Sequence, residues 1–117
     1  MKLFLVGFDN TLKIVKKFIM KHYADIQFGM YSTMLDVREL TEQIRYAEKE
    51  YDGILFTCAS SAKRLLAAYG TDKIEDAAIY SIGPKTTECL KKQGILKVLE
   101  AEESTYEKLA KLCVQTG

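Results

Sequence analysis

Short apolar runs alternate with amphipathic segments along the whole chain. In the first amphipathic segment Leu12, Val15, Phe18, Ile19 and His22 share one face, a spacing that predicts a helix with His22 turned inward. The apolar runs are bounded by polar or glycine residues, as strands are. The five expected strands cover residues 2–6, 25–30, 51–57, 77–81 and 96–99.

Capping residues mark where the expected helices begin and end. Ser, Asp and Asn side chains accept hydrogen bonds from the free N–H groups of a first helical turn, and a Glu three residues later completes the pair. Gly70 and Gly94 are expected to end helices. The expected caps are Asp9-Asn10, Asp36 with Glu39, Ser60 or Ser61, and Ser104 with Glu107; a further helix is expected over residues 86–93.

This alternation of strands and helices predicts the fold class. Short connections between five strand–helix units imply a mostly parallel sheet flanked by helices, an α/β arrangement of the flavodoxin-like kind. The run 54–56, Ile-Leu-Phe, is apolar throughout, as expected of a strand covered on both faces. At 117 residues, without a linker or repeat, residues 1–117 are expected to form a single domain.

The composition argues against several classes of function. Lys plus Arg number 17 and Asp plus Glu 16, so no charge excess indicates a nucleic-acid partner. No apolar run approaches the roughly 20 residues of a membrane span, and the opening segment lacks the features of a signal peptide. Three cysteines without CxxC spacing and one histidine indicate neither a disulfide framework nor a metal site, which favours a cytoplasmic protein with reduced thiols.

Hydroxyl-bearing residues gather in the loops that follow the expected strands. In a parallel sheet these loops meet at the carboxyl edge, where ligands bind. The turn Gly83-Pro84 leads into a helix whose first turn carries Thr86 and Thr87, beside N–H groups that can bind an anion. Loops rich in hydroxyls favour an anionic or hydrogen-bonding ligand over acid–base chemistry. Helix capping alone is the structural alternative for these residues.

Two other residues at this edge have open interpretations. Cys58 lies at a strand-to-helix turn, where a thiol can act as a nucleophile, although a small residue facing the core is the commoner use of such a cysteine. Tyr31 falls where the second expected strand leaves the sheet, whereas the other tyrosines have ordinary packing positions.

Four segments, in order along the chain, resemble the uroporphyrinogen-III synthase family. The stretch YDGILFTCASSAKRLL, residues 51–66, is similar to its Asp, apolar strand, Phe-Thr-Ser and Ala-Val-Arg pattern, and IGPKTTECLKKQG, residues 82–94, to its Ile-Gly-Pro-x-Thr-Ala turn. Residues 30–33 resemble its Val-Tyr-x-Thr, and residues 101–109 its closing segment. The resemblance is to the C-terminal half of a synthase roughly twice as long, and Cys58 replaces the serine of Phe-Thr-Ser.

The resemblance implies a cofactor-free enzyme that closes the linear tetrapyrrole hydroxymethylbilane into uroporphyrinogen III and binds no metal. It assigns Tyr31 a catalytic role in departure of the hydroxyl group. Helix N-termini and nearby polar groups would hold the substrate carboxylates. The implied substrate-binding residues are Thr57, Cys58, Ser60, Gly83, Thr86 and Thr87.

Two questions about function and assembly stay open at this point. The rival function is a non-catalytic sensor or regulatory module that binds a small anion. In the family a cleft lies between two domains and each half-repeat is divided between them, so residues 1–30 are expected either to fold back onto their own chain or to exchange with a second copy in a homodimer.

Overall fold

The computed structural model describes residues 2–22, 26–32, 51–69, 71 and 77–116. The expected helix that begins near Asp36 lies outside these residues. The elements are β1 (Lys2–Gly7), α1 (Asp9–Met20), β2 (Gln27–Ser32), β3 (Gly53–Phe56), α3 (Ala59–Tyr69), β4 (Ala78–Ser81), α4 (Pro84–Lys92), β5 (Leu99–Glu100) and α5 (Tyr106–Thr116).

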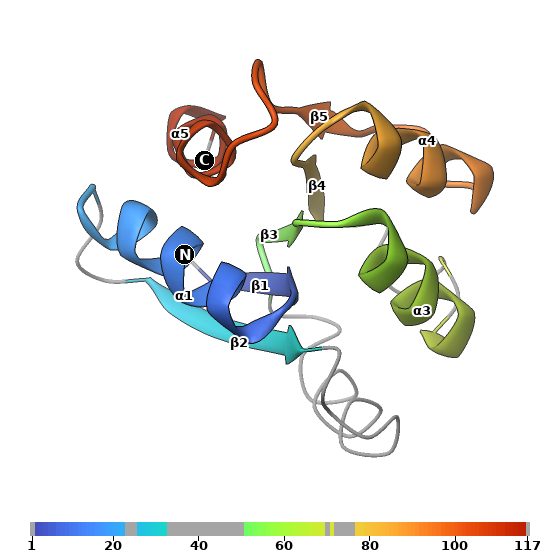
Figure 1. The fold of residues 1–117 in the computed structure, drawn as a ribbon, viewed down its shortest axis with the longest axis horizontal. Helices are drawn as coiled ribbons and strands as arrows, with labels where there is room; N and C mark the ends of the chain where they lie inside the picture. Colours follow the sequence, from blue (N-terminus) through green and yellow to red (C-terminus); the bar gives the residue numbers. More distant parts are fainter. Residues whose placement is uncertain (1, 23–25, 33–50, 70, 72–76, 117) are drawn as a thin grey trace.

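The five strands form one parallel sheet in the order β2-β1-β3-β4-β5 (Figure 1). Every residue of β3 is buried, and β1 is buried from Leu3 onward, because both strands lie inside the sheet and are covered on both faces. The α/β, flavodoxin-like fold expected from the alternating pattern is therefore confirmed.

Among the described helices, α1 and α5 cover one face of the sheet, and α3 and α4 cover the other (Figure 1). Alternate residues of β1 point to opposite faces, so Leu3 and Leu5 pack with α1 and α5 while Phe4 and Val6 pack with α3 and α4. On the first face the helices contribute Leu12, Val15, Ile19, Leu109, Ala110 and Cys113; on the second they contribute Ala62, Leu65, Leu66 and Leu90.

Several expected local details are wrong. Phe8, not Asp9-Asn10, is the N-cap of α1, and no side chain caps this helix. Thr105 rather than Ser104 caps α5, because its Oγ1 accepts the N–H of Lys108 at 3.2 Å and its carbonyl accepts that of Leu109 at 3.0 Å. His22 follows α1 in a turn and is exposed, since the helix ends before this residue can face the core.

The fifth strand is shorter and later than expected. Only Leu99 and Glu100 pair with β4, opposite Tyr80 and Ser81. After α4 the chain turns at Gly94, whose φ of 98° is the left-handed conformation that glycine adopts without strain. The residues that follow run beside β4 and leave a hollow between the two segments before the pairing begins.

Candidate functional site

The site expected at the carboxyl edge lies at the point where the chain changes direction across the sheet. From β1 the chain passes through α1 to β2 on one side, whereas from β3 it passes through α3 to β4 on the other. The loops after β1 and β3 therefore diverge, and such a switch point is where doubly wound sheets bind ligands. Gly7 ends β1 here and Phe8 follows it, whereas Thr57 and Cys58 follow β3.

Thr57 joins the two loops at the switch point. Its Oγ1 donates to the carbonyl oxygen of Val6 at 2.7 Å, and its N–H donates to the same oxygen at 3.0 Å. The residue is buried, and a Cβ at Gly7 would overlap its Oγ1. The hydroxyl proton expected to serve a ligand is thus used inside the fold, so Thr57 is placed to position the loops.

Cys58 stands at the N-cap of α3, since its carbonyl accepts the first helical hydrogen bond from the N–H of Ala62 at 3.2 Å. Its Sγ lies 2.9 Å from Oγ of the fully buried Ser61 and 3.6 Å from Oγ of the exposed Ser60. The backbone N–H groups of the first turn have no acceptor within the helix and point toward the carboxyl edge. Cys58 and Ser60 therefore lie beside unpaired backbone donors.

Ser81 organises the turn before α4, a role that the sequence interpretation missed. Its Oγ donates to the carbonyl oxygen of Gly83 at 2.9 Å, and it accepts the hydroxyl of Thr87 at 2.9 Å and the N–H of Gly83 at 3.4 Å. Gly83 has an extended backbone that any residue could adopt. Glycine is needed there because a Cβ would overlap Oγ of Ser104.

Thr86 differs from its neighbours because its hydroxyl makes no hydrogen bond within the part of the chain that the structure describes. Its side chain is only 3% exposed, and its hydroxyl has no hydrogen-bond partner among the described residues. A buried polar group without a partner normally costs stability. The N–H groups of Lys85 and Thr86 also lack acceptors within α4, whose first helical residue is Pro84. The backbone N–H donors at the start of α4 thus lie next to the Thr86 hydroxyl in the sequence.

Charge distinguishes the helix N-termini on the two faces of the sheet. The first turns of α1 and α5 carry Asp9 and Glu107, which neutralise the positive end of each helix dipole. The first turns of α3 and α4 carry no acidic residue, and α4 has the exposed Lys85 there. An anion is therefore better accommodated on the α3 and α4 face.

The structure thus brings six of the expected site residues together in two neighbouring loops and the first helical turns after them. The loop from β3 to α3 supplies Thr57, Cys58 and Ser60, and the one from β4 to α4 supplies Gly83, Thr86 and Thr87. The backbone of Tyr31 lies in β2 opposite Val6 rather than beyond the strand. The position of its side chain lies outside what the structure describes.

Phe8 is a further edge residue that the sequence interpretation did not select. It follows β1 directly at the switch point, and its side chain is 52% exposed. An exposed aromatic residue directly after an apolar strand was the available signal. It offers an apolar surface beside the polar loops.

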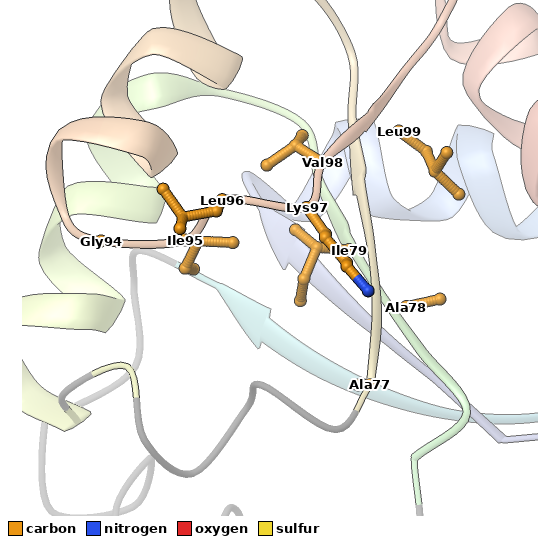
Figure 2. A pocket seen from close by; sticks show the side chains of 9 residues that line it. All are labelled: Ala77, Ala78, Ile79, Gly94, Ile95, Leu96, Lys97, Val98 and Leu99. Carbon is orange, nitrogen blue, oxygen red and sulfur yellow. The ribbon is translucent and has the colours of Figure 1, made fainter.

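A separate hollow lies away from these loops. It runs along the outer side of β4, beginning at the amino end of this strand (Figure 2). Among the described residues that line it, Lys97 is charged and the others are apolar or glycine. The lining residues are Ala77, Ala78, Ile79, Gly94, Ile95, Leu96, Lys97, Val98 and Leu99. None of the expected site residues contributes to it.

A family model described as uroporphyrinogen-III synthase HemD matches residues 3–112. This chain belongs to the uroporphyrinogen-III synthase family. The match spans β1 to α5 and includes Tyr31 and both polar loops. The family suspected from the four motifs is thereby confirmed, and with it the connection to tetrapyrrole biosynthesis. No curated protein matched the chain.

The described part of this synthase-family domain contains no cluster of side chains placed for metal chemistry. Within it, no group of three His, Cys, Asp or Glu side chains is placed to hold a metal ion. Burial raises the pKa of the Cys113 thiol from 9.0 to about 12, but this residue lies in α5, away from both polar loops. None of the described helices is long and apolar enough to cross a membrane.

Proposed function

We propose that this domain binds hydroxymethylbilane and takes part in its cyclisation to uroporphyrinogen III, a lyase reaction in the cytoplasm. The observation that carries the proposal is the pair of helix N-termini on the α3 and α4 face. They present backbone donors without an acidic residue in the first helical turn, in a chain of the uroporphyrinogen-III synthase family. A linear tetrapyrrole carries several carboxylates, which are suitable ligands for such donors.

In this reaction the domain would act mainly by holding a flexible substrate in one folded shape. Bringing the two ends of the chain together removes much of the entropic barrier to ring closure. Ser60, Thr86 and Lys85 would contact carboxylates, while Thr57, Gly83 and Thr87 keep the loops in place. Tyr31 would assist departure of the hydroxyl group, as the family resemblance implies. No cofactor is required for this scheme.

In the family the cleft lies between two domains, so a second half would complete it here. In the described chain β1 pairs with both β2 and β3 in one sheet. The same pairings formed between two copies would give a homodimer in which both copies contribute Tyr31 and Thr86. A different chain supplying the second half is the other arrangement compatible with the proposed activity.

The direct test is incubation with freshly generated hydroxymethylbilane, followed by separation of uroporphyrin isomers I and III. Isomer III above the level of a heat-inactivated control is expected. Lys85→Gln should reduce its yield, because this lysine lies at the α4 N-terminus. Lys97→Gln is the matched control, since Lys97 lies at the outer hollow. Isomer I alone at high protein concentration would refute the enzymatic proposal.

A non-catalytic anion-binding module is the second candidate function. It is favoured by the internal use of the Thr57 and Thr87 hydroxyls, which leaves mainly backbone donors at the described edge. Thermal-shift measurements with tetrapyrroles, nucleotides and small carboxylates separate the two functions, because a bound ligand raises the melting temperature. A shift with another ligand and none with any tetrapyrrole would favour the module.

A further inference from the structure

The three cysteines of this chain occupy different environments. Cys113 is 1% exposed in the core between α1 and α5, where burial keeps its thiol protonated. Cys58 and Cys89 are both half-buried and thus partly accessible from solvent. Oxidants react with accessible thiols in preference to buried ones. Of the three, Cys58 and Cys89 are therefore placed for reaction while the protein is folded.

Cys58 and Cys89 lie close to each other on neighbouring helices. Cys58 caps α3, and Cys89 lies in the second turn of α4, beside α3 on the same face of the sheet (Figure 1). The Sγ of Cys89 is 3.5 Å from the carbonyl oxygen of Ala59, the residue directly after Cys58. The Cys89 thiol thus contacts the residue next to Cys58.

We propose that Cys58 and Cys89 form a reversible intramolecular disulfide when the protein meets hydrogen peroxide. The sulfur of Cys58 first attacks one peroxide oxygen, which gives a sulfenic acid and one water molecule. The sulfur of Cys89 then displaces the sulfenic hydroxyl, forms the S–S bond and releases a second water. Overall the two thiols lose two hydrogen atoms and one peroxide is reduced to two waters.

Formation of this bond requires a local movement that the first turn of α3 permits. Disulfides join residues whose Cα atoms are usually about 4.4–6.8 Å apart, so Cys58 must leave its contact with Ser61 and turn toward α4. The N–H groups of that turn have no acceptor within the helix, so its movement breaks few backbone hydrogen bonds. Oxidation would then alter the edge that carries Ser60. This last consequence rests on the proposed function, whereas the disulfide does not.

The test uses the complete, fully reduced chain, treated with hydrogen peroxide under native conditions and then quenched with an alkylating reagent. The intact mass should show loss of two hydrogen atoms and one alkylated thiol. Trypsin digestion without reductant should release residues 50–63 joined to residues 86–91, the peptides that contain Cys58 and Cys89. Reductant should restore the original mass.

Three variants and an unfolded sample make the result decisive. Cys58→Ser and Cys89→Ser should each abolish the linked peptide, while Cys113→Ser should retain it. In denaturant the link between Cys89 and Cys113 should form at least as readily as that between Cys58 and Cys89, because Cys89 and Cys113 are closest in sequence. If the folded chain instead yields that link, disulfides between chains, only overoxidised sulfur or no reaction, the proposal is wrong.

Discussion

Replacing Gly7 by alanine tests how the switch point is held together. The added methyl would overlap Oγ1 of Thr57 and would lie only 3.2 Å from its Cβ and 3.3 Å from Cδ2 of Leu12. Thr57 is buried, so its side chain must rotate away and lose the 2.7 Å hydrogen bond to Val6. Crowding and the lost hydrogen bond should both destabilise the fold.

The two effects set the expected magnitude. Overpacking a closely packed site costs about 1–3 kcal/mol, and the lost hydrogen bond costs about 1 kcal/mol. Gly7→Ala should therefore lower the free energy of unfolding by about 2–4 kcal/mol. Thr57→Ala alone should cost only about 1–2 kcal/mol, since the Val6 carbonyl still accepts the backbone N–H of residue 57 at 3.0 Å.

A double-mutant cycle measured by urea denaturation and circular dichroism checks this argument. Because Thr57→Ala removes the atom that Gly7→Ala meets first, the double variant should be at least about 1 kcal/mol more stable than additivity predicts. At roughly 4 °C per kcal/mol, Gly7→Ala should lower the melting temperature by about 8–16 °C. Strictly additive losses would show that the two residues do not interact, and the account of the switch point would fail.

Three further predictions address the site, the core and the assembly. Thr86→Ala should weaken binding of an anionic ligand by about 1.5–3 kcal/mol in titration calorimetry, with little change in melting temperature, because the hydroxyl has no described partner; unchanged affinity with a large loss of stability would contradict this. The free energy of unfolding should fall between pH 9.0 and about 12, because only the unfolded state readily ionises Cys113 in this range. Cys113→Ala should make this pH dependence less steep. An equally steep dependence in the variant would refute its assignment to Cys113. Gel filtration with light scattering should give a monomer if residues 1–30 stay in their own chain; a dimer persisting at micromolar dilution and lost on their deletion indicates exchange.

The layout of the fold could be predicted from the sequence because local patterns and packing agree there. The apolar run 54–56 lies in β3, and Leu12, Val15 and Ile19 face the core as the helical spacing indicated. Ends of elements were less predictable. Ser104 and Thr105 can both cap a helix, and only the tertiary contact of Ser104 with Gly83 distinguishes them. The short β5 likewise depends on packing that a pattern does not reveal.

The location of the candidate site was more predictable than the use of each hydroxyl. The alternation of strands and helices along the chain, together with the composition of the loops, placed Thr57 and Thr87 at the carboxyl edge, where they lie. Whether a hydroxyl faces a ligand or another group of the fold depends on how the surrounding segments pack. Thr57 reaches Val6 and Thr87 reaches Ser81, and neither contact has a signature in the sequence.

These internal contacts change how ligand recognition at this edge should be understood. With the protons of Thr57 and Thr87 used within the fold, the donors that remain are chiefly backbone N–H groups at the starts of α3 and α4. Backbone donors are held by the helix itself, so their positions do not depend on side-chain rotamers. For the proposed ligand, specificity would then arise from the spacing of the two helix starts, which the parallel pairing of β3 with β4 sets. A ligand with carboxylates at several points along a flexible chain can match such a spacing, whereas a small single anion uses only one helix start.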